Sequence, residues 1–254
     1  MMSAPATATF RFHGGLHDFV PRRQRHAPIT HTFTWKASVK DMIESLGPPH
    51  SEVWLLLANG VSIDFEYIVQ NGDVIDAYDV ESAPDIENAV ILVPPYPTRP
   101  RFILDQHLGR SAAYLRMLGF DTLYRNDYHD EELARVSDED TRILLTRDVG
   151  LLKRGRVTYG YFVRSTDPLV SLREIARRFD LADHVQPFQY CIKCNGLLHP
   201  VEKAKIVDQL QPETAAAFQE FHQCGSCQQI YWKGAHFGKM EKLVQEVLED
   251  LKNA

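Results

Sequence analysis

Short runs in which hydrophobic and polar residues alternate predict a first region built mainly of strands. Strands are expected at residues 7–12, 32–35, 53–58, 61–65 and 74–78. One helix is expected between Ser38, a good N-cap residue, and Gly47, a good helix stop. Asn59-Gly60 is a hairpin-turn sequence between the third and fourth strands. These elements predict a small α+β domain.

The predicted order of the elements, ββαβββ, is that of a β-grasp, ubiquitin-like domain, which we place at residues 1–93. Sulfur carriers with this fold end in a free Gly-Gly tail, whereas here the chain continues, so a carrier role is not expected. The simplest function for such a domain is protein binding or scaffolding, which implies a protein partner.

Four prolines within residues 94–100 favour an extended segment and mark a linker. Beyond it, strand and helix patterns alternate. Strands are expected at 101–105, 121–125, 142–147 and 159–164, and helices at about 110–118, 130–136 and 168–179. Alternation of this kind predicts an α/β domain with a parallel sheet at residues 101–190.

Two of these buried strands end on an aspartate, Asp105 and Asp148. Because ligands of open parallel sheets bind at the carboxyl ends of the strands, these carboxylates are candidates for a shared site. Asp130 and Asp127 follow the second strand, and Asp167 follows the fourth. Clustered carboxylates favour Mg²⁺ or Mn²⁺, which can activate water for phosphodiester hydrolysis.

Simpler roles exist for three of these acids. Asp130 and Asp167 would serve as helix N-caps, and Asp127 as a solvated loop residue. Asp105 and Asp148 are harder to explain in this way, because a lone carboxylate at the end of a buried strand is costly unless it is paired or liganded.

Charge is distributed unevenly along the 254 residues, whose net charge is −6. Residues 1–97 carry 6 basic and 12 acidic residues, whereas residues 98–190 carry 15 basic and 14 acidic residues. With its acids neutralised by cations, this arginine-rich region would suit a phosphate-bearing partner such as RNA. A solvated charged face is the alternative for each arginine that we consider for RNA binding: Arg110, Arg116, Arg147 and Arg154.

The four cysteines of the chain form two CxxC pairs, Cys191/Cys194 and Cys224/Cys227. Two such pairs are typical of a structural Zn²⁺ site with four thiolate ligands, whereas a redox site needs only one. A zinc ribbon and a closing amphipathic helix are therefore expected at residues 191–254. Tyr231, Trp232 and Phe237 would either stack on bases or form the small core of the ribbon.

Composition fits a folded protein, with 44% hydrophobic and 24% charged residues. There is no signal-peptide pattern in the first twenty residues, and no apolar run approaches the ~20 residues that span a bilayer. We expect no membrane segment and a cytoplasmic location.

Residues about 101–240 resemble the Mut-seven C-terminal RNase family, a branch of the PIN-like nucleases that carries a zinc ribbon. This resemblance rests on FILDQHLGRSAAYLRMLGFDT, on DEELARVSDEDTRILLTRDVGLLKR, and on CIKC…CGSC followed by IYWKGAH. Upstream, VKDMIESLGPPHSEV and NGDVIDAY resemble the ubiquitin-like domain that accompanies this RNase in bacteria.

The resemblance implies a PIN-like Rossmannoid core and a metal-dependent ribonuclease. Its acidic positions fall on Asp105, Asp130 and Asp148, and a fourth carboxylate would be Asp167 or Asp127. The choice of RNA over DNA comes from the resemblance alone. Two other functions remain open: a non-catalytic RNA-binding protein, and a protein-interaction adaptor that works through the β-grasp domain.

Overall fold

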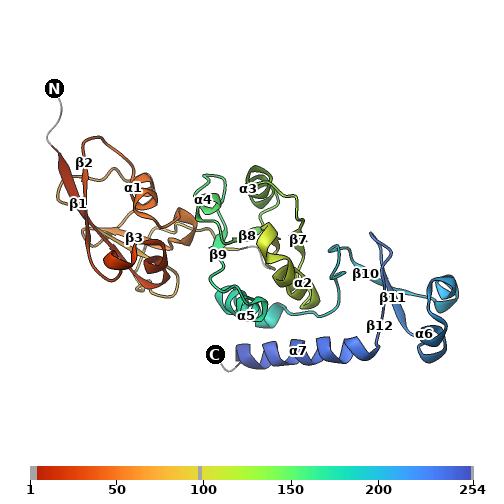
Figure 1. The fold of residues 1–254 in the computed structure, drawn as a ribbon. Coiled ribbons are helices and arrows are strands. Elements are labelled where there is room, and N and C mark those ends of the chain that lie inside the picture. Colours follow the sequence, from red (N-terminus) through yellow and green to blue (C-terminus); the bar gives the residue numbers. More distant parts are fainter. Residues whose placement is uncertain (1–4, 97–98, 253–254) are drawn as a thin grey trace. The chain divides into compact units, whose positions relative to one another are not determined.

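The computed structural model describes residues 5–96 and 99–252. The chain forms two compact units (Figure 1). The first comprises Met1–Tyr96 and Asp148–Phe162, and the second comprises Pro97–Arg147 and Val163–Ala254. Residues 148–162 group with the N-terminal region, although they continue the α/β sequence pattern.

The sheet of the N-terminal unit confirms the predicted β-grasp, ubiquitin-like domain. Its strands β1 (Ala6–Phe12), β2 (Ile29–Phe33), β3 (Leu55–Ala58), β4 (Val61–Ser62) and β5 (Val74–Tyr78) lie in the order β2-β1-β5-β3-β4. The central pair, β1 and β5, is parallel, and the other pairs are antiparallel. Asn59 and Gly60 both have positive φ, as the predicted hairpin turn between β3 and β4 requires.

Helix α1 (Val39–Leu46) begins and ends as the sequence predicts. At its start, the Ser38 side chain accepts a hydrogen bond from the Asp41 N–H at 3.1 Å. At its end, Gly47 has φ +137°, and a Cβ there would lie 2.1 Å from the Phe19 carbonyl oxygen. Only glycine fits this close approach, so the helix stops here.

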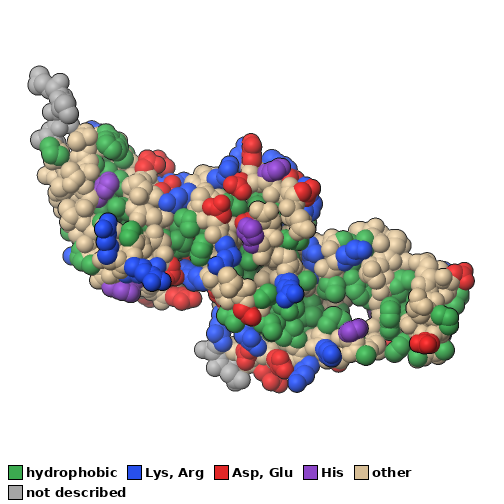
Figure 2. Space-filling model, viewed as in Figure 1, with side chains coloured by type: hydrophobic (Ala, Val, Ile, Leu, Met, Phe, Trp, Pro, Cys, Tyr) green, Lys and Arg blue, Asp and Glu red, His purple; other side chains and the backbone are tan. Residues whose placement is uncertain are grey.

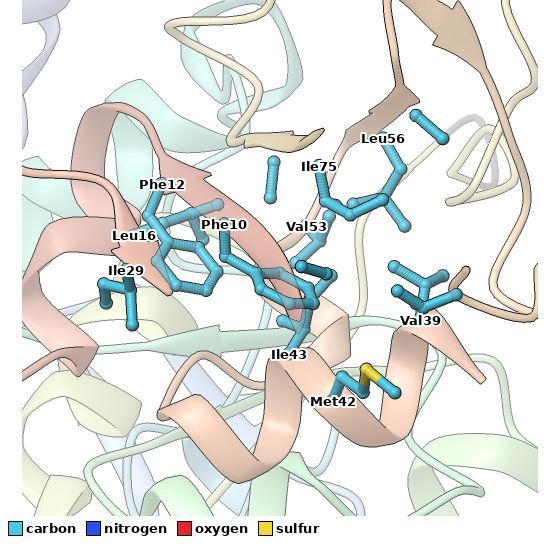
Figure 3. Packing of buried hydrophobic residues seen from close by; sticks show 14 of the residues in the cluster. Phe10, Phe12, Leu16, Ile29, Val39, Met42, Ile43, Val53, Leu56 and Ile75 are labelled. Carbon is cyan, nitrogen blue, oxygen red and sulfur yellow. The ribbon is translucent and has the colours of Figure 1, made fainter. Parts of the chain in front are cut away.

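One face of α1 closes the core of this domain against the sheet (Figure 3). The side chains of α1 contribute at i, i+3 and i+4, and the strands contribute the residues that alternate inward. The fully buried members include Phe10, Leu16, Val39, Ile43, Val53, Leu56 and Ile75.

Two predicted strands of this domain depart most from their expected limits. The strand expected at 32–35 is β2, which ends at Phe33, and the strand expected at 61–65 is only Val61–Ser62. The second ends early because the Asp64 carboxylate accepts a hydrogen bond from the Glu66 N–H at 3.0 Å and turns the chain. Short 3₁₀ helices at Gly14–Phe19, Arg22–Gln24 and His50–Glu52 were not predicted.

Residues 148–162 form a helix, α4 (Val149–Leu152), and a strand, β9 (Gly160–Phe162), that belong to the N-terminal unit. Polar contacts to the 3₁₀ helix His50–Glu52 and to α1 connect this segment to the rest of the N-terminal unit. Glu52 Oε1 accepts a hydrogen bond from the Phe162 N–H at 2.5 Å, and the Ser51 hydroxyl donates to the Leu152 carbonyl at 3.4 Å. The Lys153 ammonium donates to the Glu44 carbonyl at 2.5 Å.

In the second unit, β6 (Phe102–Leu104) lies between β7 (Thr122–Tyr124) and β8 (Ile143–Thr146), and all three strands are parallel. The 3₁₀ helix Gln106–Leu108 leads into α2 (Gly109–Met117), and α3 (Asp130–Glu139) connects β7 to β8. Helix α5 (Pro168–Arg178) contacts α2. The predicted parallel α/β arrangement is confirmed.

The C-terminal part of this unit is a small antiparallel sheet followed by a long helix. Strands β10 (Leu198–Val201), β11 (Phe221–Cys224) and β12 (Ile230–Trp232) lie in that order, and α6 (Pro212–Ala217) lies between β10 and β11. Short 3₁₀ helices occupy Ala182–His184, Lys203–Lys205 and Val207–Gln209. The predicted closing helix is α7 (Ala235–Lys252), which buries Val244 and Val247 and contacts α5.

Candidate active site and metal centre

Asp105 lies directly after β6, where it is only 7% exposed. Its Oδ1 accepts a hydrogen bond from the Gln106 N–H at 2.6 Å, and its Oδ2 accepts one from the hydroxyl of Thr146 at 2.8 Å. Thr146 is the last residue of β8, the parallel neighbour of β6. The carboxylate is therefore fixed at the carboxyl edge of the sheet, as its position in the sequence predicts.

In the described part of the chain, the two groups that donate to the Asp105 carboxylate are both uncharged. Tyr124, which ends the other neighbouring strand, is affected by this charge: burial raises the pKa of Tyr124, and the negative charge of Asp105 raises it further. Burying an anion without a countercharge is costly. This edge of the sheet is therefore suited to a cation.

Asp130 is the first residue of α3, which follows β7, and its side chain is exposed. The N-cap of this helix is His129, so the simpler N-cap role considered for Asp130 is wrong. Asp130 and the two glutamates after it instead place negative charge at the positive end of the helix dipole. Asp127 forms an exposed pair with Arg125 at 2.9 Å.

The expectation that Asp148 ends a buried strand is wrong, because β8 ends at Thr146 and Asp148 is exposed. Asp148 and Asp167 each cap a helix with one carboxylate oxygen. Asp148 Oδ1 accepts hydrogen bonds from the N–H groups of Gly150 and Leu151 at 2.7 and 3.2 Å, at the start of α4 in the N-terminal unit. In the second unit, Asp167 Oδ1 accepts from two N–H groups at the start of α5, at 2.9 and 3.0 Å. These two hydrogen bonds lower the pKa of Asp167.

Two of the four candidate RNA-binding arginines, Arg110 and Arg147, line one cavity of ≈ 460 Å³ in the second unit. Arg147 is held there by a hydrogen bond from Nη1 to the Arg164 carbonyl at 3.2 Å. Helices α2 and α5 both begin beside this cavity. The start of α2 adds the positive end of its dipole, whereas the Asp167 carboxylate caps the start of α5. Other polar residues of the lining are His107, Ser111, Ser165, Thr166 and Ser171.

The other two arginines lie elsewhere. Arg116 is only 3% exposed, and its guanidinium donates hydrogen bonds to the carbonyls of Thr122, Ile192 and Lys193 at 2.9, 3.1 and 3.2 Å. This places Arg116 in the interior of the domain rather than at an RNA surface. Its spacing of four residues from the buried Ala112 on α2 is a signal that could have shown this. Arg154 is exposed and follows α4 in the N-terminal unit.

The four cysteines come together as predicted, and their sulfur atoms all lie within 4.8 Å of one another. The Cys191–Cys227 and Cys194–Cys224 sulfur pairs are 3.7 and 3.4 Å apart. A tetrahedral ion with bonds of about 2.3 Å to sulfur needs sulfur atoms about 3.8 Å apart. The cysteines are therefore positioned to bind a metal ion.

The backbone around Cys224 favours a thiolate. Burial raises the pKa of the Cys224 thiol, but the N–H groups of Cys227 and Ser226 outweigh it and lower the pKa to about 7. For Cys194, burial raises the pKa to about 12, a cost that a bound dication would remove. Gly196 makes room for the cluster, because a Cβ there would lie 2.7 Å from the Cys224 sulfur.

The fold and these sites define a ubiquitin-like domain joined to a parallel α/β domain with a buried carboxylate at the end of one strand and a cysteine cluster positioned to bind a metal ion. The family model of the Mut7-C RNAse domain matches residues 100–244, and that of the Mut7-C ubiquitin domain matches residues 5–85. The chain belongs to the Mut7-C RNase family and is a nuclease-type enzyme with a ubiquitin-like domain. No curated protein and no solved structure matches it.

None of the helices within residues 5–96 and 99–252 combines the length and the apolar character that crossing a membrane demands.

Proposed function

We propose that this protein is a metal-dependent ribonuclease that uses Mg²⁺ or Mn²⁺. The observation that carries the proposal is Asp105, a buried carboxylate at the carboxyl edge of the sheet whose two partners are uncharged. Asp130 and Asp148 would complete the ligand set, with Asp167 as the fourth acid. The metal ions would activate water and neutralise the charge that develops on the phosphate.

Each of these side chains has a task that its surroundings support. The Thr146 hydroxyl and the Gln106 N–H orient the Asp105 carboxylate, so that it need not reorganise when a cation binds. Asp148 and Asp167 use Oδ1 for helix capping, which fixes the direction of each carboxylate. Oxygen ligands of this kind are those that Mg²⁺ and Mn²⁺ prefer.

Substrate binding would use the cavity that contains Arg110 and Arg147. Two guanidinium groups and several hydroxyl groups offer hydrogen-bond donors to a phosphodiester, and the N-terminus of α2 adds positive potential. His107 of the same cavity lies two residues after Asp105, so phosphate binding and the buried carboxylate belong to one stretch of chain. The choice of RNA as the polymer follows the family.

The four cysteines would hold a structural Zn²⁺. Four thiolates fill a tetrahedral coordination shell and leave no position for water, so this ion stabilises the ribbon and takes no part in hydrolysis. Four reduced thiols also fit a reducing compartment such as the cytoplasm, the location we propose.

Asp105→Asn tests the catalytic proposal. Because changes to groups that only support a metal ligand cost about 10–100-fold, loss of a direct ligand should slow Mn²⁺-dependent cleavage of RNA by at least about 100-fold. The matched control is Asp138→Asn, which removes the same charge from an exposed position near the end of α3. Its rate should equal that of the unmodified protein. Equal rates for Asp105→Asn and the control, or cleavage that needs no divalent cation, would refute the proposal.

A further inference from the structure

A second cavity in the second unit, of ≈ 250 Å³, is lined by Phe, Tyr and Trp rings together with aliphatic side chains. It lies among the segment before the first cysteine pair, the ribbon sheet and the start of α7. Figure 2 shows hydrophobic side chains gathered around a hollow beside the N-terminal part of α7. Its lining includes Phe188, Tyr190, Tyr231, Trp232, Lys233 and Phe237.

The walls of this aromatic cavity are held in place by the fold. Phe188 and Phe237 contact each other with ring centroids 4.7 Å apart, and the Tyr231 hydroxyl lies 3.0 Å from the Cys191 sulfur. Phe188 has φ +61°, a conformation that is unusual for a bulky residue. Its N–H donates to the Met117 carbonyl at 3.0 Å, which helps to hold it there.

The mouth of the cavity combines an exposed ring with two opposite charges. Trp232 is 37% exposed, although large aromatic residues are usually well buried. The Lys233 ammonium lies 5.8 Å from the centroid of Phe237, and Glu220 lies on the same lining. Because the negative charge of Glu220 offsets the positive charge of Lys233, stacking on the rings rather than attraction of phosphate would dominate binding here.

We infer that the aromatic cavity binds an unpaired nucleobase of single-stranded RNA. Its volume is below the ~300–1,000 Å³ of sites for drug-sized ligands, which suits a single planar ring system. Aromatic side chains stack on any base, whereas the bases of a duplex are stacked and paired with each other. The inference rests on the proposed function and specifies its substrate class as single-stranded RNA.

The test measures RNA affinity separately from cleavage. Full-length protein, with and without Trp232→Ala, is titrated by fluorescence anisotropy without added Mg²⁺ or Mn²⁺. The probe is a labelled single strand of roughly eight nucleotides, and the same sequence is tested as a duplex. Loss of one stacked base should weaken single-strand binding by roughly 5- to 150-fold. Duplex binding should be weaker and unchanged by the substitution.

Three controls separate loss of stacking from other effects. Trp35→Ala removes an exposed indole from the N-terminal unit and should leave affinity unchanged. Trp232→Phe keeps an aromatic ring and should retain most of the affinity. Bound zinc per chain should be the same in all variants, which shows that the ribbon is folded. Because stacking carries the effect, the ratio of affinities should be similar at about 50 and 200 mM salt.

Equal single-strand affinity for Trp232→Ala and the unmodified protein would overturn the inference, as would a failure of the unmodified protein to bind single-stranded RNA. Either result would favour a protein side chain as the occupant of the cavity. Binding that depends on Trp232 in a protein that cleaves no RNA would support the cavity and refute the nuclease proposal, so the two failures are distinguishable.

Discussion

Substitution of Glu52 tests how strongly its hydrogen bond holds residues 148–162 in the N-terminal unit. Glu52 is only 7% exposed, and its Oε1 accepts a hydrogen bond from the Phe162 N–H at 2.5 Å. Glu52→Ala removes this acceptor and leaves a backbone donor of β9 without it. The segment that begins with Asp148 should then open more readily.

The expected cost follows from the kind of hydrogen bond that is lost. A hydrogen bond to a charged acceptor contributes about 1.5–3 kcal/mol. Removing a buried carboxylate also removes the cost of desolvating it, which offsets part of the loss. We therefore expect destabilisation of about 1–3 kcal/mol. Glu52→Gln keeps an acceptor and should cost less.

Hydrogen exchange measured by mass spectrometry reports this opening directly. If the loss appears as local opening, exchange in the peptide that covers residues 148–162 should be roughly 5- to 150-fold faster in Glu52→Ala. Glu66→Ala, which removes the same side chain from an exposed position in the same unit, is the control and should not change exchange in that peptide. Unchanged exchange in Glu52→Ala would refute the view that this contact holds the segment.

Two further predictions concern the second unit. Cys224→Ser should reduce bound zinc, measured by metal analysis, from one ion per chain to none. It should also lower the unfolding temperature of the ribbon, measured by calorimetry. Full retention of zinc would contradict the four-thiolate site. Burial raises the pKa of Asp121, but hydrogen bonds from Arg142, both at 2.9 Å, and from Asn195 outweigh it and hold the pKa below its usual value. The Asp121–Arg142 ion pair should therefore contribute its full stability above pH ~3.9, the pKa of an Asp carboxyl group in the unfolded chain. This contribution should be lost as the pH falls through the lower pKa of Asp121 in the folded protein. Asp121→Asn should lower the free energy of unfolding by about 1–3 kcal/mol at neutral pH. It should also make the free energy of unfolding, measured with urea, less dependent on pH in the acid range. An equal pH dependence in both proteins would refute the role of Asp121 in this ion pair.

The sequence by itself determined the features that depend on neighbours in the chain. Ser38 and Gly47 limit α1 because capping and a positive φ are local requirements. Each CxxC pair brings its own two sulfur atoms together because one tight turn is enough, whereas the two pairs meet only through the fold of the ribbon. Asp105 was found at a strand end because a buried apolar run that stops on a carboxylate is visible without any tertiary contact.

Only the tertiary structure decided which distant groups meet. The sequence pattern of residues 148–162 is that of an α/β domain, yet buried side chains of Glu52 and Ser51 bind its backbone and group it with the ubiquitin-like domain. The sequence makes Arg116 a candidate phosphate ligand, but in the fold its guanidinium donates hydrogen bonds to three backbone carbonyl groups. Such contacts join residues far apart in the chain, and no local period or spacing encodes them, because their energy comes from desolvation and pairing in the folded interior.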